Sequence, residues 1–199
     1  GSVEAALALR LCANGLPLVA APDAALEVQG EPDAALRCIA HWLRDNGLAS
    51  RWRDELLAVT DETGLAHAVV ERAAVRPLGI ATFAVHLIAF APDGSLWVQQ
   101  RALDKATDPG QWDTLMGGLV SAAESPVLAL ERETWEEAGL HIAELGQVRL
   151  ADRLTIRRPV REGYMVEHIQ VFEAELPAGR VPVNQDGEVA RFECIEPDD

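Results

Sequence analysis

The sequence has few cysteines and no long apolar segment, and each absence excludes a class of protein. Its three cysteines, Cys12, Cys38 and Cys194, show no CxxC spacing, which argues against a disulfide scaffold or a zinc site. No apolar run reaches the roughly 18 residues of a transmembrane helix, and the first residues do not resemble a signal peptide. We therefore expect a cytoplasmic protein rather than a secreted or membrane-spanning one.

Positive charge is also scarce, because 17 Lys and Arg residues stand against 32 Asp and Glu residues, for a formal net charge of -15. An acidic surface repels phosphate backbones and anionic lipid, so we expect neither a nucleic acid polymer nor a membrane as a partner. A small anionic ligand stays compatible with this charge if a metal ion or a local basic patch mediates the contact. The length and the apolar content of 49% suit one large domain, or a domain with a smaller companion.

Residues 1–79 are predicted to form a small α/β extension. Helical patterns mark residues 2–15 and, most clearly, 32–47. Residues 55–60 and 66–75 follow them, and we expect two strands there, or a strand followed by a short turn. Composition does not decide whether this extension forms walls of a substrate site, a dimer interface that makes a homodimer, or only a stabilising element.

Residues 80–199 are predicted to form a second, mixed α/β domain. Two β-rich runs, 81–92 and 95–103, are joined by the tight hairpin signal Asp93-Gly94. A loop and a helix come next. Three further strands are expected at 146–158, 164–176 and 190–196.

A helix with well-marked ends is expected from Pro126 to Ala138. Ser125 supplies a hydroxyl cap, Pro126 suits the first helical position, and Gly139 suits the position after the last turn. Most of its apolar side chains are expected to face a core. These are Val127, Leu128, Leu130, Trp135 and Ala138.

Three glutamates gather at the end of this helix, where negative charge is unfavourable. Glu133, Glu136 and Glu137 have the i, i+3, i+4 spacing that places side chains on one helix face. The helix dipole disfavours a carboxylate in the last turns by roughly 0.3–1 kcal/mol, and the like charges repel one another. A solvated helix face is the ordinary explanation of such a run. A bound Mg²⁺ or Mn²⁺, which prefers hard oxygen ligands, would instead turn the repulsion into a binding site.

The spacing of these residues resembles a known motif, the Nudix box G-x5-E-x7-R-E-U-x-E-E-x-G-U, in which U is a bulky apolar residue. The match runs from Gly118 to Leu140, all seven fixed letters are present, and Thr134 at the first U position is the one departure. The resemblance implies an α/β/α sandwich with a mixed sheet. It also implies hydrolysis of a nucleoside diphosphate or another organic diphosphate. The expected partner is therefore a small-molecule diphosphate substrate, with Mg²⁺ or Mn²⁺ as the cofactor.

Carried over by position, the resemblance assigns roles to the fixed residues of the box. The three glutamates at the helix end are similar to the metal ligands of the family, and the backbone carbonyl of Gly118 completes that set. Arg132 and Glu124 are similar to the pair that orients those carboxylates.

Two segments offer a general base for the attack of water on phosphorus. Glu133 is the first candidate, because it belongs to the box. Nudix enzymes often take the base from a distant loop, and residues 184–192 offer Asp186 and Glu188 there. A turn before the last strand explains Asp186-Gly187 equally well.

Segments outside the box resemble one branch of the family. They are residues 52–59, 71–80, 85–90 and 96–120, and they are similar to proteins related to the Nudix half of fungal thiamin pyrophosphokinase fusions. Members of that branch carry an N-terminal extension of this kind. The resemblance implies hydrolysis of thiamin diphosphate and its oxidised derivatives to the monophosphate.

Three side chains near the box are compatible with such a substrate. Arg101 and Lys105 follow the second strand of the domain, and they could hold phosphate oxygens or form a solvent-exposed strand end. Trp112 could stack on a thiazolium ring, although a tryptophan packed under the loop is the more ordinary role.

Two further features have ordinary explanations beside a functional one. His86 lies in an apolar strand and is expected to be a hydrogen-bonded sheet residue before any catalytic one. Arg157, Arg158 and Arg161 form the only basic cluster of the sequence. They could approach an anionic substrate or pair with the acidic surface.

Two alternatives share the expected fold. An isopentenyl diphosphate isomerase has a similar run before the box, but its chemistry needs a cysteine acid just before the helix. Residues 112–120 contain neither cysteine nor histidine, so that reaction lacks an evident proton donor. The second alternative is a Nudix domain that only binds a ligand or a partner protein. Such domains usually have degenerate boxes, whereas this box keeps every carboxylate.

Overall fold

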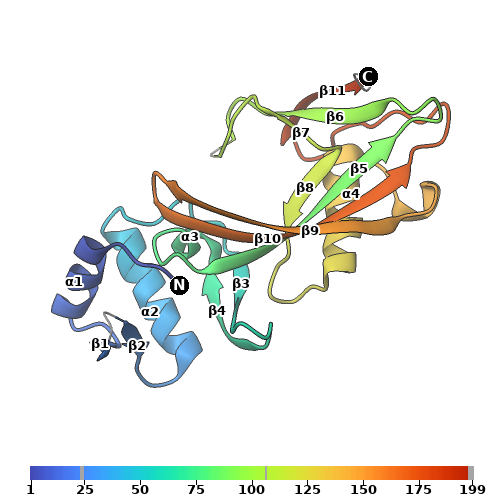
Figure 1. The fold of residues 1–199 in the computed structure, drawn as a ribbon. Helices are drawn as coiled ribbons and strands as arrows, with labels where there is room; N and C mark the ends of the chain where they lie inside the picture. The colour runs from blue at the N-terminus through green and yellow to red at the C-terminus, as the bar shows by residue number, and fades with distance from the viewer. Residues whose placement is uncertain (23–24, 106, 197–199) are drawn as a thin grey trace. The chain divides into compact units, whose positions relative to one another are not determined.

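The computed structural model describes residues 1–22, 25–105 and 107–196. Helices and strands follow one another along the chain (Figure 1), which confirms the predicted α/β class. Within these described ranges, no helix is long and apolar enough to cross a membrane.

The chain forms two compact units. The first comprises Gly1–Thr82 and Thr155–Glu167, and the second comprises Phe83–Leu154 and His168–Asp199. The segment Thr155–Glu167 thus belongs with the N-terminal residues although it lies late in the sequence. The predicted domain boundary between residues 79 and 80 stays a prediction.

The first unit contains one strongly amphipathic helix, α2 (Pro32–Asp45), where the sequence predicts it. The Glu31 carboxylate caps this helix by accepting hydrogen bonds from the backbone N–H groups of Asp33 and Ala34, at 3.0 and 2.8 Å. The other elements are α1 (Ala5–Ala13), α3 (Arg72–Val75) and two antiparallel pairs, β1 (Leu18–Ala20) with β2 (Leu26–Val28) and β3 (Leu56–Thr60) with β4 (Ala66–Glu71).

The later elements are seven strands, a helix and one short turn of 3-10 helix. They are β5 (Ala81–Phe90), β6 (Leu96–Arg101), β7 (Trp112–Asp113), β8 (Met116–Leu119), α4 (Pro126–Ala138), η2 (Ile142–Glu144), β9 (Arg149–Val160), β10 (Gly163–Glu175) and β11 (Val189–Ile195).

The strands form a sheet in the order β11-β6-β5-β10-β9, in which β7 pairs with β6 and β8 pairs with β5. The arrows of β5 and β10 point the same way in Figure 1, whereas β5 is antiparallel to β8, so the sheet is mixed, as predicted. The register places His86 opposite Gly117 and Val85 opposite Gly118. The two glycines therefore have their free space on opposite faces of the sheet.

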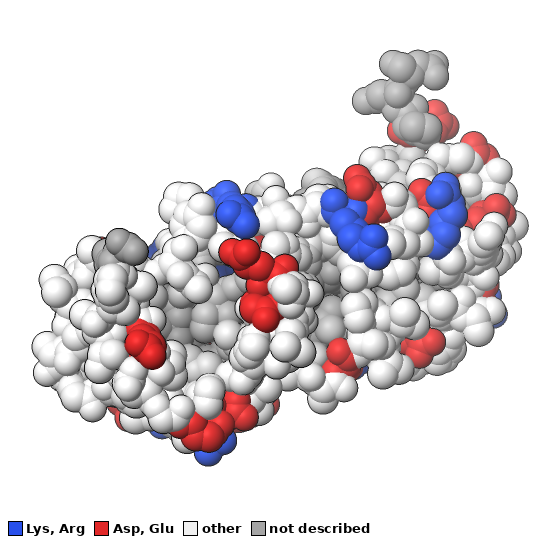
Figure 2. Space-filling model, turned by 60° about the horizontal axis from the view of Figure 1, so that its bottom comes forward, with Lys and Arg blue, Asp and Glu red and all other residues white. Residues whose placement is uncertain are grey.

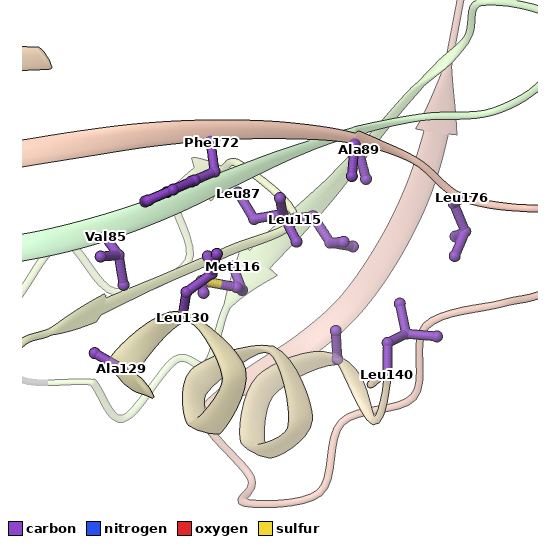
Figure 3. Close-up of a cluster of buried hydrophobic side chains, with 12 residues drawn as sticks. Val85, Leu87, Ala89, Leu115, Met116, Ala129, Leu130, Leu140, Phe172 and Leu176 are labelled. Atoms are coloured by element: carbon purple, nitrogen blue, oxygen red, sulfur yellow. The ribbon is translucent and has the colours of Figure 1, made fainter. Parts of the chain in front are cut away.

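Helix α4 packs against one face of this sheet, and buried apolar side chains fill the interface (Figure 3). Val85, Leu87 and Ala89 alternate along β5 and therefore point to that face. The other members of the cluster are Leu115, Met116, Ala129, Leu130, Ala138, Leu140, Phe172, Ala174 and Leu176.

The predicted core face of α4 is wrong in part. Val127, Leu128 and Trp135 were expected in the core, but they are 56%, 53% and 44% exposed. Ala129, Leu130 and Ala138 belong to the buried cluster instead. The Thr134 hydroxyl donates to the carbonyl of Leu130 at 2.6 Å, which explains how threonine is accommodated at a buried motif position. The buried residues of α4 are Ala129, Leu130, Thr134, Glu137 and Ala138.

Candidate active site

The ends of helix α4 lie where the sequence predicts them, and this places the three glutamates in its last turns. The Ser125 hydroxyl accepts a hydrogen bond from the backbone N–H of Leu128 at 3.3 Å, and Pro126 occupies the first turn. Gly139 follows the last turn with a φ of 63°, in the left-handed region. A Cβ atom at Gly139 would lie 2.5 Å from the carbonyl oxygen of Val183, so space as well as backbone conformation requires glycine there.

A loop before β11 is hydrogen-bonded to this end of the helix. The backbone N–H of Val183 donates to the last helical carbonyl at 2.8 Å, and the N–H of Gln185 donates to the carbonyl of Glu136 at 3.0 Å. The Asn184 side chain donates to the carbonyl of Glu137 at 3.4 Å. Because the last carbonyls of a helix have no partner within it, the loop satisfies them and is thereby held beside the box.

Glu137 is buried, with 1% of its surface exposed. Its Oε2 accepts hydrogen bonds from Nε2 of Gln99 at 2.8 Å and from the backbone N–H of Gly117 at 3.0 Å. Its Oε1 lies 3.2 Å from the ammonium of Lys105. The carboxylate is therefore fixed from two sides, by strands β6 and β8 and by the loop that follows β6.

Arg132 links Glu124 to the other two glutamates of the box. Its Nε and Nη2 donate to the two carboxylate oxygens of Glu124 at 2.7 and 2.9 Å, and Nη1 donates to Glu133 at 2.8 Å and Glu136 at 3.0 Å. The hydrogen bonds from Arg132 hold the pKa of Glu124 at about 2. The Arg132 guanidinium thus binds the Glu124 carboxylate in a bidentate geometry, which is consistent with the orienting role that the motif assigns to this pair.

Glu133 has a pKa raised to about 7, mainly because its carboxylate is buried. Repulsion from Glu137 and Glu136 adds to this effect, and the nearby Arg132 opposes it. The negative charge of the cluster is therefore incompletely balanced by the protein itself.

Gly118 leaves the space into which the Glu133 carboxyl group fits. A Cβ atom at Gly118 would lie 2.0 Å from Cδ of Glu133, so any other residue would push the carboxylate away from the backbone. Three carboxylates beside a backbone carbonyl are hard oxygen donors, which is the chemistry that Mg²⁺ and Mn²⁺ prefer. The residues therefore fit such a cation.

The carboxylates do not, however, converge on one point in this structure. Across residues 1–22, 25–105 and 107–196, no three His, Cys, Asp or Glu side chains form a ready-made metal cluster. Nη1 of Arg132 contacts Glu133 and Glu136, and Lys105 contacts Glu137. A divalent cation would have to displace these cationic side chains from the glutamate oxygens.

The two loop acids have different surroundings. Glu188 lies 2.6 Å from Lys105, the same ammonium that contacts Glu137. Asp186 accepts hydrogen bonds from the Asn184 amide and from the backbone N–H of Glu188, both at 2.8 Å, which is the geometry of a side-chain-stabilised turn. Of the two candidate bases, the structure brings Glu188 toward the box and uses Asp186 to shape the loop.

The predicted substrate-binding residues are held by neighbouring groups. Arg101 donates to Asp113 at 3.2 Å and to the carbonyl of Thr107 at 3.0 Å. Trp112 is 44% exposed, and the guanidinium of Arg191 lies 5.1 Å from its ring centroid. Lys105 contacts two carboxylates, as described above. None of the three side chains is a freely solvated strand end.

His86 is a hydrogen-bonded residue of β5, as expected. The Thr114 hydroxyl donates its proton to the carbonyl of Met116 at 2.9 Å, so it accepts from Nδ1 of His86 at 3.1 Å. A Cβ atom at Gly117 would lie 2.7 Å from Cε1 of His86. The ring therefore occupies the space that a side chain at position 117 would need.

Three groups that hold the site are not evident from the sequence. Gln99 and the N–H of Gly117 fix Glu137, and Asn184 attaches the loop to the helix. The Asn-Gln-Asp-Gly run from residue 184 is a turn signal that points to the loop, whereas nothing in the sequence marks Gln99. The basic cluster Arg157, Arg158 and Arg161 belongs to the first unit.

Comparison with known sequences gives a domain and several relatives. The sequence model of the NUDIX domain matches residues 81–199. Nudix hydrolase 24, chloroplastic, of Arabidopsis thaliana is 30% identical over 172 residues, which cover 83% of this chain and 47% of the relative. An isopentenyl-diphosphate Delta-isomerase of Streptomyces coelicolor is 37% identical over 98 residues, which cover 47% of this chain and 50% of the isomerase. The chain thus spans about half the length of the curated relatives it matches.

Among solved structures, DR0079 from Deinococcus radiodurans superposes on this chain with a TM-score of 0.59. The two are 20% identical, and the superposition covers 71% of this chain and 83% of the other. At that identity the likeness establishes the shared fold alone.

Proposed function

Because the chain belongs to the Nudix family, we propose that it hydrolyses the phosphoanhydride bond of a small organic diphosphate with the help of Mg²⁺ or Mn²⁺. The observation that carries this proposal is the concentration of carboxylates where α4 ends beside Gly118. Glu137 is buried there, and Glu133 has a pKa raised to about 7. Such a cluster is costly for a fold unless it binds a cation.

The residues of the site would divide the work among them. Glu133, Glu136, Glu137 and the Gly118 carbonyl would hold the cation, which when bound neutralises diphosphate charge and lowers the pKa of a water. The Glu124–Arg132 pair keeps the loop before α4 in place against the helix. The hydrogen bonds from β6 and β8 keep the Glu137 carboxylate in one orientation, so little reorganisation is needed when the site is loaded.

Glu133 is our first candidate for the general base, and Glu188 is the second. Glu133 is supported by its place in the box, where its carboxyl group fills the space above Gly118. Glu188 is supported by its position, because Lys105 joins it to the box. Profiles of kcat/KM against pH for Glu133→Gln and Glu188→Gln distinguish the two, since replacing the base removes the acidic limb of the profile.

For the organic half of the substrate, we propose thiamin diphosphate or one of its oxidised derivatives. The support is the resemblance of residues 52–59, 71–80 and 96–120 to the branch associated with those compounds. Arg101 would turn from Asp113, and Lys105 from Glu137, toward phosphate oxygens. Trp112 exposes part of its ring and already stacks with one cation, Arg191, so it is suited to a thiazolium as well.

The direct test is an assay of phosphate and monophosphate release from a panel of diphosphates in the presence of Mg²⁺. The panel includes thiamin diphosphate, its oxidised forms, ADP-ribose, nucleoside triphosphates and isopentenyl diphosphate. We expect Glu136→Gln and Glu137→Gln to lower kcat by at least roughly 100-fold, because each removes a proposed ligand of the catalytic cation. Gln is nearly isosteric with Glu, so circular dichroism should show an unchanged fold.

Other outcomes identify the alternatives. Conversion of isopentenyl diphosphate to its allylic isomer without phosphate release would support an isomerase, although residues 112–120 contain no cysteine to act as the acid. Tight binding of a ligand without turnover would support a binding module. Equal activity of the wild type and both glutamine variants would contradict the proposed site.

A further inference from the structure

Lys105 is the only lysine of the chain, and arginine accounts for the rest of the 17 Lys and Arg residues. Its ammonium lies 3.2 Å from Oε1 of Glu137 and 2.6 Å from Oε2 of Glu188. The Lys105 side chain is 13% exposed, so the ammonium is enclosed between two carboxylates rather than hydrated. Lys105 thus connects Glu137, a buried glutamate of the box, to Glu188 in the loop that is hydrogen-bonded to the end of α4.

Within the described part of the chain, one buried oxygen next to Glu137 lacks a hydrogen-bond donor. Gln99 and the Gly117 N–H satisfy Oε2, and the Lys105 ammonium faces Oε1. Oε1 of Gln99 is also buried and, among the residues that the structure describes, has no hydrogen-bond partner. A hydrated divalent cation could satisfy this oxygen, because its waters are donors, while its charge attracts the carboxylates.

We propose that Lys105 is a positioning residue that acts as the replaceable counter-ion of Glu137. Without a divalent cation, its ammonium compensates the buried charge of Glu137 and keeps Glu188 next to the box. When Mg²⁺ or Mn²⁺ binds, Oε1 of Glu137 becomes available only as Lys105 withdraws from it and keeps its contact with Glu188. The inference rests on the proposed function, because it assumes that Glu137 is a metal ligand.

The choice of lysine over arginine fits this exchange. A lysine ammonium is a compact point charge on a flexible stem, whereas an arginine binds a carboxylate through a planar fork that has to be given up as a unit. A buried carboxylate without a partner strongly destabilises the fold. A protein that binds its cation reversibly is therefore more stable in the metal-free state if another positive charge compensates the carboxylate. Lys105 supplies that charge without leaving the site.

The single lysine makes the exchange directly observable by NMR. In protein labelled with ¹³C and ¹⁵N at lysine, one side-chain spin system is present, and it reports the surroundings of Lys105. Titration with Mg²⁺ in the absence of substrate should shift its Cε and Hε resonances in the wild type. The same titration of the Glu137→Gln protein should leave those resonances in place, because the oxygen for which lysine and cation compete is gone.

Substitution of Lys105 tests the competition through the affinity for Mn²⁺, measured by electron paramagnetic resonance without substrate. Lys105→Met keeps the length of the stem and removes the charge, so Mn²⁺ should bind at least roughly 10-fold more tightly. The metal-free variant should also melt at least about 5 °C lower than the wild type, and Mn²⁺ should restore most of that loss. Lys105→Arg keeps the charge but holds a carboxylate through its planar fork, so it should bind Mn²⁺ no more tightly than the wild type.

Arg149→Met is the matched control, because it removes a positive charge that pairs with Glu173 outside the box. Its Mn²⁺ affinity should equal that of the wild type. Mn²⁺ binding by the wild type with no gain in Lys105→Met, or a lysine signal that stays still while the Gly117 amide signal moves, would overturn the inference. Absence of Mn²⁺ binding by the wild type would instead overturn the proposed function.

Discussion

The three glutamates at the end of α4 differ in what surrounds their carboxylates. Glu137 is buried and fixed on both oxygens, whereas Glu136 is 41% exposed and contacts Nη1 of Arg132. Glu133 lies between these extremes, because its carboxyl group fills the space above Gly118. Three identical residues in one motif therefore have different surroundings, and burial raises the pKa of Glu133 to about 7.

We predict that Glu133 makes the metal-free protein less stable as the pH rises from 4.5 to 7. Its pKa rises from 4.5 in the unfolded chain to about 7 in the fold, so the folded state binds the proton more tightly. The stabilisation is complete below the unfolded value and is lost as the pH rises through about 7. It amounts to on the order of 2–3 kcal/mol. Thermal unfolding in a chelator at several pH values should show this decline in the wild type and a smaller one in Glu133→Gln.

Glu124 has the opposite dependence and does not interfere with this measurement. The hydrogen bonds from Arg132 lower its pKa from 4.5 to about 2, so its contribution is present above 4.5 and is lost only as the pH falls through about 2. The difference between the wild type and Glu133→Gln between pH 4.5 and 7 therefore reports Glu133 without a contribution from Glu124. Parallel stability curves for the wild type and Glu133→Gln across that interval would show that the carboxyl group is not buried as described.

At the scale of elements, the box depends on the contact between the end of α4 and the loop before β11. The loop donates to the carbonyls of the last helical residues and carries Glu188 into place. Gly139 makes the contact possible, because a side chain there would strike the carbonyl of Val183 and the amide of Gln185. Gly139 thus has two roles: it ends the helix, and it leaves the space that the loop before β11 needs to contact the helix end.

We predict that Gly139→Ala destabilises the protein by more than the roughly 1–2 kcal/mol that a left-handed alanine costs. The added Cβ would lie 2.5 Å from the carbonyl oxygen of Val183, so the loop has to move away from the helix. Gly179→Ala is the control, because Gly179 also has a positive φ, of 82°, but has no atom within 4 Å of the added carbon. Urea unfolding should show a clearly larger loss of unfolding free energy for Gly139→Ala. Equal losses would contradict the close contact between the loop before β11 and the end of α4.

The sequence predicts the elements of this region better than it predicts their contacts. The limits of α4 follow from Ser125, Pro126 and Gly139, because caps are local signals. The buried face of α4 does not follow, because the sheet selects the small side chains of Ala129 and Thr134 over the larger Leu128 and Trp135. Trp135 stacks on His141 instead, with ring centroids 4.5 Å apart, and no periodic pattern predicts such a pair.

For the site residues too, the sequence predicts local features but not the contacts between distant segments. Every fixed letter of the motif is readable in the sequence, because the motif lies on one continuous segment. The partners of Glu137 come from β6, β8 and the loop after β6, and only the fold brings Gln99 and Lys105 to it. The position of Glu188 depends likewise on hydrogen bonds between distant segments.

At the scale of the whole molecule, an acidic chain is proposed to act on an anionic substrate. Acidic and basic side chains form small separate groups on the face drawn in Figure 2, with uncharged surface between them. With a net charge of -15, the average field of the protein repels a diphosphate. Productive binding therefore depends on local positive charge, which Arg101, Lys105 and a bound divalent cation would supply.

The most direct test of the account is a crystal structure determined after soaking in Mn²⁺, with anomalous differences recorded to locate the metal. We predict a manganese ion bound by Glu133, Glu136, Glu137 and the Gly118 carbonyl, with the Lys105 ammonium moved away from Glu137. Carboxylates that stay paired with Arg132 and Lys105, with no anomalous peak beside Gly118 at saturating Mn²⁺, would contradict the claim that this acidic cluster exists to bind a divalent cation.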